Sequence, residues 1–585
     1  MNDPGQAEVR ALVARGELLM AFDRASELLE KEPADPSLRY LAALSLARAG
    51  APERAGTELA HLDGKAFDDR RLAEDVAALR ARLVKDRALS REGRERRATA
   101  GEASQLYEAV AREYGSHFAA INAATMAQVA GDGGRARLLA GEARRLVEDQ
   151  PPSPGDETYW RAATRIEAAL LLGEMEAAAE ALRQARAASA GNPALRATTR
   201  RQLRLICRET GADERIIDAL PVPVVVHYTG HRFTARDNDQ DALRMAINGA
   251  LDRAGAGIAF GSLAYGSDIL VAEEVLARGA GLHVILPCPA DQFAEWSVAP
   301  GGEDWSERFA ACMAAATSVW CDPSYAPVDE PVMYAFGARL AMGHAIMQAD
   351  ALTTTAVQVA LWDGEDGDSE AGTASDVAAW REIGGTTEVI ACRHPDAREG
   401  PAPDYPGPSM ELRAMVFADF HGFSRLNERQ VFVFFDSVMG ALATAVDRAG
   451  DEVLYRNTWG DGLYLVFRTT PGAATGSLAL HRAFEALDLE HLGLPSGMGL
   501  RIGIHAGPVF AGTDPIRHEP SFFGTHVTRT ARIEPRTPPG EVYMTASSAA
   551  LLALDPVPGM TPEYVGHIAT AKDFGVFPMY VLTRR

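Results

Sequence analysis

Two aspartates have the residue type and surroundings for the most specific chemistry in this chain. Asp419 lies in MVFADFHGFSRL (415–426) and Asp461 lies in YRNTWGDGLYLVF (455–467), each where an apolar strand pattern breaks into a glycine turn. Hard divalent cations take oxygen ligands, and two cations about 4 Å apart need shared acidic ligands. The pair therefore indicates phosphoryl chemistry on metals, although a lone aspartate in a turn usually bonds only the local backbone.

The pattern around the pair predicts the elements that would position it. A strand ends at Asp419, and a helix begins at Asn427 with Gln430 three residues on, as in a capping box. The dipeptide Asp461-Gly462 is typical of a hairpin turn between two strands. If these strands are neighbours in a sheet, the two carboxylates face each other.

Further motifs follow in the C-terminal third of the chain. LRIGIHAGPVFAG (500–512) alternates as a strand in which Arg501 faces away from its apolar neighbours. SFFGTHVTRTARIE (521–534) passes from a glycine turn into a helix that carries Arg529 and Arg532, and PPGEVYMT leads into another strand. These segments would add cationic side chains to the acidic pair.

Taken in order, FADFHGFS, NTWGDG, RIGIHAGPV, FFGTHVTRTARIE and PPGEVYMT resemble the class III nucleotidyl cyclase catalytic domain over residues 410–585. The resemblance implies an α+β ferredoxin-like domain that works as a head-to-tail homodimer with active sites at the interface. It also implies a reaction in which the 3′-hydroxyl of a nucleoside triphosphate, ATP by default, attacks the α-phosphorus and pyrophosphate leaves. Positioned cations, including two Mg²⁺ or Mn²⁺ ions, would stabilise the charge on the phosphates.

The resemblance also implies a role for each matching residue. The metal ligands would be Asp419, Asp461 and the backbone carbonyl of Phe420; the phosphates would lie against Gly422, Phe423, Ser424 and Arg501; and the opposite protomer would supply Arg532 and Lys572. Thr528 stands where the family has a ribose-orienting asparagine, and the segment around Lys572 departs from the family pattern by one residue.

The base-reading positions depart from the family more strongly. Asn457 stands where adenylate cyclases carry lysine and guanylate cyclases usually carry glutamate, and the partner position is Ser521 in place of aspartate or cysteine. An amide can donate or accept, so GTP or a pyrimidine triphosphate remains an alternative to ATP. Trp459 and Phe523 lie near the expected base pocket, and for both we favour packing in the core over narrowing of the pocket.

Residues 1–215 show helical spacing and almost no strand signal. Three stretches, 38–55, 119–136 and 160–178, each place small residues in an apolar helix, then a turn, then a second helix. They resemble degenerate tetratricopeptide-type hairpins, whose stacking would offer a surface to a protein partner. A generic helical bundle is the alternative interpretation.

Residues 220–393 alternate strands, glycine turns and helices, which predicts a Rossmann-like, doubly wound parallel sheet. GHR after the first strand, GSLAYGSD after the second and LHVILP in the third resemble the SLOG group of Rossmann-like domains. The resemblance implies a sensing pocket for a nucleotide-like ligand; a structural spacer is the alternative. Its candidate site residues are Gly230, His231, Arg232, Gly261, Ser262, Gly266 and Ser267.

The composition limits the partners of the chain. Its 585 residues predict three or four domains, and the proline-rich segment 394–409 predicts a linker before the last of them. A formal net charge of -22 argues against a nucleic-acid partner, and no apolar run approaches the roughly 20 residues of a membrane span. The five cysteines show no metal or disulfide spacing, so we expect a cytoplasmic protein.

An active, ligand-regulated cyclase and a non-catalytic nucleotide-binding signalling scaffold are both compatible with these motifs. Asp419, Asp461 and Arg532 are all present, and loss of any one would have favoured the scaffold. We therefore expect an enzyme.

Overall fold

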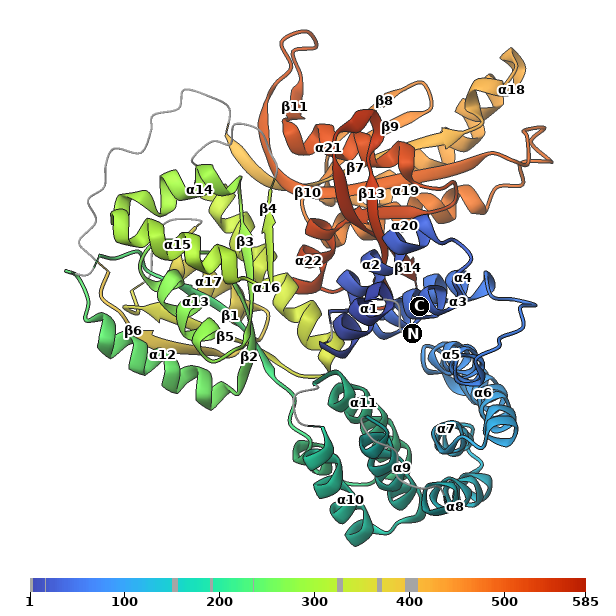
Figure 1. Cartoon of the computed structure of the whole chain (residues 1–585). Coiled ribbons are helices and arrows are strands. Elements are labelled where there is room, and N and C mark those ends of the chain that lie inside the picture. Colours follow the sequence, from blue (N-terminus) through green and yellow to red (C-terminus); the bar gives the residue numbers. More distant parts are fainter. Residues whose placement is uncertain are drawn as a thin grey trace. The chain divides into compact units, whose positions relative to one another are not determined.

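The protein is described here by a computed structural model. The described residues are 4–15, 17–149, 156–189, 193–234, 236–322, 330–365, 371–394 and 409–584. They divide into two compact units, Met1–Val222 with Ala351–Thr354 and Pro223–Asp350 with Thr355–Arg584 (Figure 1). The predicted linker lies outside the described residues over 395–408.

The first unit is built of helices over its described part, as its composition predicted. Its elements are α1 (Pro4–Arg15), α2 (Leu18–Lys31), α3 (Pro36–Arg48), α4 (Pro52–Ala60), α5 (Arg70–Leu89), α6 (Gly93–Tyr114), α7 (His117–Val129), α8 (Gly133–Asp149), α9 (Asp156–Leu172), α10 (Met175–Ala188), α11 (Pro193–Thr210) and the 3-10 turn Glu214–Ala219. Alanine dominates the core between consecutive helices, which allows their backbones to pack closely.

Glycines form the turns of the three predicted helical hairpins, α3–α4, α7–α8 and α9–α10. Gly50, Gly131 and Gly173 have φ angles of 88°, 89° and 79°. No atom lies within 4 Å of a Cβ added at any of them. The left-handed backbone, and not lack of space, therefore favours glycine at these turns.

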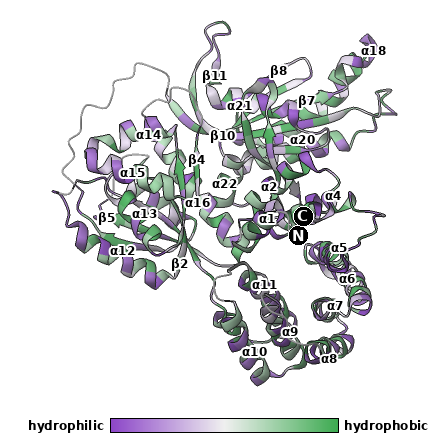
Figure 2. Cartoon of the chain, viewed as in Figure 1, coloured by the Kyte–Doolittle hydropathy of each residue, from purple (hydrophilic) through white to green (hydrophobic). Residues whose placement is uncertain are grey.

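The second unit begins with a six-stranded sheet in the order β4-β3-β2-β1-β5-β6, and every pair in it is parallel. Its elements are β1 (Val224–Gly230), α12 (Gln240–Ala254), β2 (Ala256–Gly261), α13 (Ser267–Ala277), β3 (Gly281–Leu286), α14 (Ala290–Ser297), α15 (Glu303–Ala315), β4 (Ser318–Cys321), α16 (Pro331–Leu352), β5 (Ala356–Trp362), α17 (Thr373–Glu382) and β6 (Thr387–Ala391). This is the predicted Rossmann-like domain, here called the central domain. In Figure 2 its strands carry the hydrophobic colour, as expected for a sheet covered by helices.

The strand order locates the switch point of the central sheet. From β1 the chain builds outward to β4, then returns to the other side of β1 to form β5. Ligands of open α/β sheets bind where this reversal occurs, at the carboxyl ends of the strands. The end of β1 next to β5 is that position.

The C-terminal domain is a mixed sheet in the order β13-β14-β12-β10-β7-β9-β8, with β11 paired to β10. Its elements are β7 (Met410–His421), α18 (Glu428–Val433), a π-helical turn (Phe434–Met439), α19 (Gly440–Arg448), β8 (Val453–Trp459), β9 (Gly462–Phe467), α20 (Thr470–Glu485), β10 (Gly499–Thr513), β11 (Pro520–Phe523), α21 (Thr525–Ile533), β12 (Val542–Thr545), α22 (Ala546–Leu554), β13 (Met560–Ala569) and β14 (Val576–Arg584). The capping box at Asn427 and Gln430 is present.

One helical stretch of the described chain, Glu428–Arg448, is long and apolar enough to cross a membrane by length and composition. We expected no such stretch. In its most apolar part 28% of the residues are buried. The π-helical turn interrupts it and it contains three acidic residues, Glu428, Asp436 and Asp447, so it gives only weak evidence for a membrane span.

Candidate functional site

The C-terminal sheet brings the two predicted metal aspartates together. Asp419 lies near the end of β7, β9 pairs with β7, and Asp461 lies in the loop before β9. Burial, the neighbouring Asp419 charge and a hydrogen bond to Asp419 raise the pKa of Asp461 to about 6. The backbone N–H of Phe420 donates to Asp461 and acts in the opposite direction. Two carboxylates in such contact repel each other when both are ionised, which a cation would relieve.

The hairpin that carries Asp461 differs by one residue from the predicted turn. The two loop residues are Gly460 and Asp461, while Gly462 already pairs with Trp459 across the strands. Gly460 has φ of 63°, which type II′ hairpin turns require at their first loop position. Gly462 is needed for space, because an added Cβ would lie 2.7 Å from Nε1 of Trp459.

Arg501 lies directly beside the acidic pair. It is the register partner of Asp419 in the β7–β10 ladder, and its Nη2 is 2.7 Å from Oδ2 of Asp419. Its Nε is 2.5 Å from Oε1 of Glu534. The guanidinium thus links two carboxylates, and a substrate phosphate would have to compete with them for it.

Sequence reasoning missed Glu534. This residue follows α21 directly and is largely buried, and burial raises the pKa of its carboxyl to about 7 while Arg501 opposes that rise. The charges of Asp419 and Asp461 raise it further. Only its place at the end of SFFGTHVTRTARIE could have suggested it, because its contact with Arg501 comes from the packing of α21 against β10.

The predicted triphosphate loop follows β7. Gly422 has φ of 92°, and a Cβ added there would meet nothing closer than 3.7 Å, so its backbone conformation favours glycine. The Phe423 ring packs on Phe434 with a centroid distance of 4.9 Å, whereas Ser424 is exposed. The Phe420 side chain is buried, so its backbone alone can face a ligand. The loop therefore presents mainly backbone groups to a bound triphosphate.

Thr528 and Arg532 share one face of α21, one turn apart. Thr528 is exposed and its hydroxyl bonds the carbonyl of Gly524 at 3.3 Å. Within the described part of one chain, no hydrogen bond or ion pair joins either residue to Asp419 or Asp461. Their predicted role in a second protomer's site stays a prediction.

The base-reading positions lie on two contacting strands. Asn457 is in β8 opposite Tyr464, Ser521 is in β11, and the Tyr464 hydroxyl donates to the carbonyl of Phe522 at 3.2 Å. Both predicted readers are half-buried. Lys572 is exposed in a short turn near the C-terminus, with φ of 59°.

The core-packing interpretation of Trp459 and Phe523 is wrong. Trp459 is 52% exposed and Phe523 is 43% exposed. Trp459 covers the edge of Phe417 at 5.7 Å, and Phe523 stacks on Phe510 at 5.8 Å. Each ring thus packs on one side only, because β8 and β11 lie at the margin of the sheet.

Comparison with protein families identifies two parts of the chain. The model of the adenylate and guanylate cyclase catalytic domain matches residues 408–573. Residues 408–573 are a class III nucleotide cyclase catalytic domain. The model of the tetratricopeptide-repeat sensor domain matches residues 19–127, which confirms the repeat interpretation over the generic bundle. Comparison with curated proteins found no match.

Solved cyclase structures are similar to the same C-terminal region. The guanylate cyclase domain of RhGC from Catenaria anguillulae, solved with GTP, is 20% identical, with 30% of this chain and 99% of that chain covered and a TM-score of 0.26. Adenylyl cyclase CyaB from P. aeruginosa is 15% identical, with 30% and 97% covered and a TM-score of 0.27. The assignment of the cyclase domain rests on the family model.

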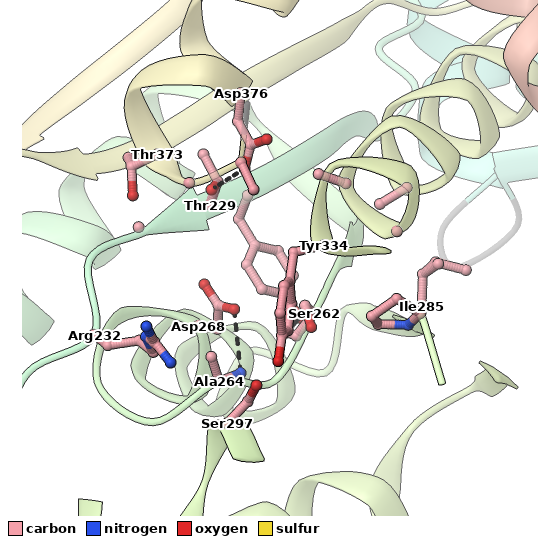
Figure 3. A pocket seen from close by; sticks show the side chains of 18 of the residues that line it. Thr229, Arg232, Ser262, Ala264, Asp268, Ile285, Ser297, Tyr334, Thr373 and Asp376 are labelled. Atoms are coloured by element: carbon pink, nitrogen blue, oxygen red, sulfur yellow. Dashed lines mark hydrogen bonds between the residues drawn. The ribbon is translucent and has the colours of Figure 1, made fainter. Parts of the chain in front are cut away.

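A second site lies in the central domain, where a cavity of about 370 Å³ opens at the switch point of the sheet (Figure 3). Of the seven residues predicted for this site, Gly230, Arg232 and Ser262 line the cavity. The Ser267 hydroxyl instead donates to the carbonyl of His231 at 2.7 Å. His231 itself lies beside Asp363, 3.1 Å from its carboxylate.

The three predicted glycines allow close packing around the cavity. A Cβ added at Gly230 would lie 2.4 Å from Ser267, one at Gly261 would lie 2.5 Å from the Tyr228 ring, and one at Gly266 would lie 2.6 Å from the Phe233 nitrogen. Gly230 and Gly266 let the end of β1 and the start of α13 approach each other, and Gly261 leaves room for the Tyr228 ring. Gly261 and Gly266 therefore shape the walls without being among the residues that line the cavity.

Two buried carboxyls on opposite sides of the cavity were not predicted as site residues (Figure 3). Burial raises the pKa of Asp268 and of Asp376 to about 7 each. Asp268 accepts from the Ala264 N–H at 3.2 Å, and Asp376 accepts from the Thr229 hydroxyl at 2.7 Å. The cavity thus pairs hydrogen-bonding acids with one cation, Arg232.

Proposed function

We propose that this protein is a nucleotidyl cyclase that converts a nucleoside triphosphate, ATP by default, to a 3′,5′-cyclic nucleotide and pyrophosphate. The observation that carries the proposal is the contact of Asp419 with Asp461, beside Arg501, in a domain that matches the cyclase family. Positioned positive charge is the main requirement of phosphoryl transfer. Arg501 and cations bound at Asp419 and Asp461 would supply that charge at the ends of the strands.

The residues present fit two divalent cations. Asp461 has a raised pKa because a second carboxylate lies against it, so the donor set carries negative charge that a cation would neutralise. Among the described residues no group of three His, Cys, Asp or Glu side chains could hold a metal, so the backbone carbonyl of Phe420 and the substrate phosphates would complete the ligands. When bound, the metals would lower the pKa of the attacking hydroxyl and neutralise charge on the phosphates.

The chain's own residues would bind and orient the substrate. The Gly422 loop would hold the triphosphate through backbone groups, and Arg501 would leave Glu534 to take the terminal phosphate. Arg532 would stabilise charge developing on the phosphates, with Lys572 assisting, and Thr528 would orient the ribose. None of these roles requires a dedicated side-chain base.

We infer that two copies of the chain form the working enzyme. Four large apolar side chains of the cyclase domain are exposed, Phe432 at 78%, Phe435 at 45%, Trp459 at 52% and Phe523 at 43%. Exposed aromatic side chains of this kind are typical of an interface. A second copy would cover them and bring its own Arg532 to the acidic pair.

Mixed dimers test the shared site. Asp419→Ala and Arg532→Ala chains should each be inactive alone, because each lacks one half of both sites. After mixing in equal amounts, half of the dimers would carry one intact site, so about a quarter of wild-type activity should return. No recovery, with mixed dimers confirmed by mass, would exclude a site shared between chains.

The reaction itself is tested with the four nucleoside triphosphates and Mg²⁺ or Mn²⁺, with cyclic products identified by mass. We expect ATP to be preferred; Asn457 and Ser521 are the residues whose exchange should change that preference. If GTP or a pyrimidine triphosphate is the substrate, the cyclase proposal stands and the predicted base is wrong. Product from none would favour the second candidate, a non-catalytic nucleotide-binding scaffold.

We further propose that the other domains regulate the cyclase. The central cavity would bind a nucleotide-like ligand, with hydroxyl or amino donors facing Asp268 and Asp376 and an anionic group facing Arg232. The helical repeats would bind a protein partner. Deletion of residues 1–215 should abolish this binding. All five cysteines are free thiols, which supports a reducing, nucleotide-rich compartment such as the cytoplasm.

A further inference from the structure

Helix α21 has two faces with different surroundings. Thr528 and Arg532 lie on the face that reaches solvent, whereas His526 and Arg529 are buried. Whatever contacts the buried face therefore sets the position from which the Arg532 side chain extends.

A buried ion pair joins this face to the central domain, which belongs to the same compact unit. Arg529 binds Asp322 through two hydrogen bonds, Nη1 to Oδ2 at 2.8 Å and Nη2 to Oδ1 at 3.0 Å. The two side chains are only 2% and 0% exposed. The Arg529 guanidinium also lies over the Phe577 ring, 4.9 Å from its centroid. A bidentate pair excluded from water holds both partners in one orientation.

Asp322 is firmly attached to the central sheet. It directly follows β4, and its backbone N–H donates to the carbonyl of Leu286 at the end of β3, at 3.1 Å. Ile285 and Pro287, on either side of Leu286, line the cavity. One hydrogen bond thus separates the cavity wall from the residue that holds α21.

Helix α16 makes a second connection, with one face on the cavity and the opposite face on the cyclase domain. Tyr334, Ala338 and Ala341 line the cavity at helical spacing. Phe336 lies about half a turn away from them and contacts His526, with ring centroids 5.7 Å apart. A Cβ added at Gly343, on the same face as Phe336, would lie 2.1 Å from the backbone oxygen of Ala550 in α22.

The contact with α16 continues into the central strand of the cyclase sheet. His526 lies 2.8 Å from His505, whose other ring nitrogen lies 2.8 Å from the Thr545 hydroxyl. His505 stands on β10, four residues after Arg501. Burial lowers the pKa of His526 to about 4, so its ring is neutral near pH 7. The contact from His526 through His505 to Thr545 therefore consists of packing and hydrogen bonds without charge.

We propose that Asp322 of the central domain is a positioning residue of the cyclase, which through Arg529 holds α21 and therefore Arg532, and that α16 makes this position depend on what fills the cavity. The kinetic part of this inference rests on the proposed cyclase function. The structural part, the attachment of α21 to Asp322, does not.

Removing the charge of Asp322 should loosen α21 without touching the metal ligands. Asp419 and Arg501 bind each other across β7 and β10 and are not members of the Asp322 pair, whose nearest charge effect on β10 is at His505. The loss should therefore appear in kcat, which depends on the Arg532 position in the transition state, and not in KM. A residue that merely stabilised the fold would not lower kcat while leaving KM unchanged.

The test uses full-length Asp322→Asn, with Glu388→Gln as the matched control. Glu388 pairs with Arg253 on the surface of the same domain, where loss of a charge should have no effect. We expect amide hydrogen exchange in α21 to rise at least tenfold in D322N and kcat to fall at least tenfold, with KM within twofold. A kcat within twofold of wild type, or unchanged exchange in α21, would overturn the proposal.

The two proposals fail in different ways. Faster exchange in D322N, with no cyclic product from the wild-type chain, would reject the cyclase function and leave the attachment of α21 intact. If D322N does not fold, Asp322→Glu retains the carboxylate with a longer arm. It should show intermediate exchange in α21 and intermediate kcat, and wild-type values for both would overturn the proposal.

A double variant tests whether Asp322 acts through Arg529. If it does, Asp322→Asn combined with Arg529→Gln should lower kcat no more than Arg529→Gln alone. Losses that multiply would show two independent effects and reject the positioning role.

A cavity-filling variant tests the role of α16. Ala338→Leu places a larger apolar side chain in the cavity in place of an unidentified ligand, and Ala338→Ser is the control. We expect at least a threefold change in α21 exchange and in kcat for A338L and less than 1.5-fold for A338S. Equal behaviour of the two variants would reject the connection between cavity and cyclase.

Discussion

The cyclase site and the central cavity each contain two aspartates, but in opposite arrangements. Asp419 and Asp461 share a hydrogen bond and are partly exposed to solvent, with Arg501 2.7 Å from Asp419. Asp268 and Asp376 are buried on opposite walls of the cavity, each with its own local donor. Contact suits two carboxylates that share cations, whereas separation suits carboxyls that bond different parts of one ligand.

The cause of the raised pKa values differs in the same way. Burial is the largest cause at Asp461, Asp268 and Asp376. At Asp461 the charge of Asp419 and a hydrogen bond to its carboxyl come next, whereas at Asp268 the charge of Asp376 adds only after the opposing hydrogen bond from Ala264, and no carboxylate raises the pKa of Asp376. A metal ion would reverse the effect at Asp461, because it replaces repulsion with attraction. A neutral ligand in the cavity would leave Asp268 and Asp376 near their raised values.

The largest expected effect comes from exchanging aspartate for asparagine in each pair. Asp419→Asn or Asp461→Asn should lower product formation at least about a thousandfold, because metal binding needs both charges. Asp268→Asn, with the same chemical change in the cavity, should change basal activity less than about fivefold. Product measured by mass gives the comparison, with folding checked by circular dichroism. Full activity in D461N would reject the metal assignment.

A smaller effect is expected in the pH dependence of metal binding. Because the pKa of Asp461 is about 6, a proton competes with the metal below that pH. Mn²⁺ affinity, measured by calorimetry, should therefore fall about tenfold per pH unit below pH 6 and change little above it. Asp268→Asn should show the same profile as wild type. Equal affinity at pH 5 and pH 7 would contradict a shared proton at the pair.

The smallest effect concerns thermal stability of the metal-free chain. The cavity carboxyls hold protons up to about pH 7 in the folded state, while unfolded aspartates release them near about pH 4. The free energy of unfolding should therefore decrease from about pH 4 to about pH 7 and level off above. Asp268→Asn or Asp376→Asn should flatten this decrease and raise Tm at pH 7.5.

A partly exposed residue outside the cavity gives the control for the Tm measurement. Asp237 has a pKa lowered by hydrogen bonds from Thr234, so Asp237→Asn should not flatten the decrease. If Tm falls with pH equally in wild type, D268N and D237N, the pKa values of the cavity aspartates are not raised.

Local patterns predicted the elements of the cyclase domain well. The alternation around Leu500 and Ile502 gave a strand with Arg501 on the other face, and both apolar neighbours are fully buried. The capping box at Asn427 needed only residues within one turn. The hairpin turn lies one residue earlier than predicted, because Gly460 and Asp461 form the two-residue loop and Gly462 already belongs to β9.

Patterns could not predict contacts that depend on packing. Glu534 meets Arg501 only because α21 and its following turn lie against β10. The exposure of Trp459 and Phe523 depends on their place at the margin of the sheet, since an aromatic residue in a strand otherwise favours burial. In the central domain the motif glycines were recognised, but Asp376 comes from α17, far along the chain.

The sequence by itself predicted the kind of reaction site, because Asp419 and Asp461 stand in short strand and turn motifs, and Arg532 in a short helix, whose form depends on neighbouring residues. The tertiary structure decided how the site is held. Asp322 and Arg529 are 207 residues apart and carry no shared motif, and they meet because two domains pack with both charges excluded from water. Burial makes each charge require the other, and only the folded chain shows which partner it has.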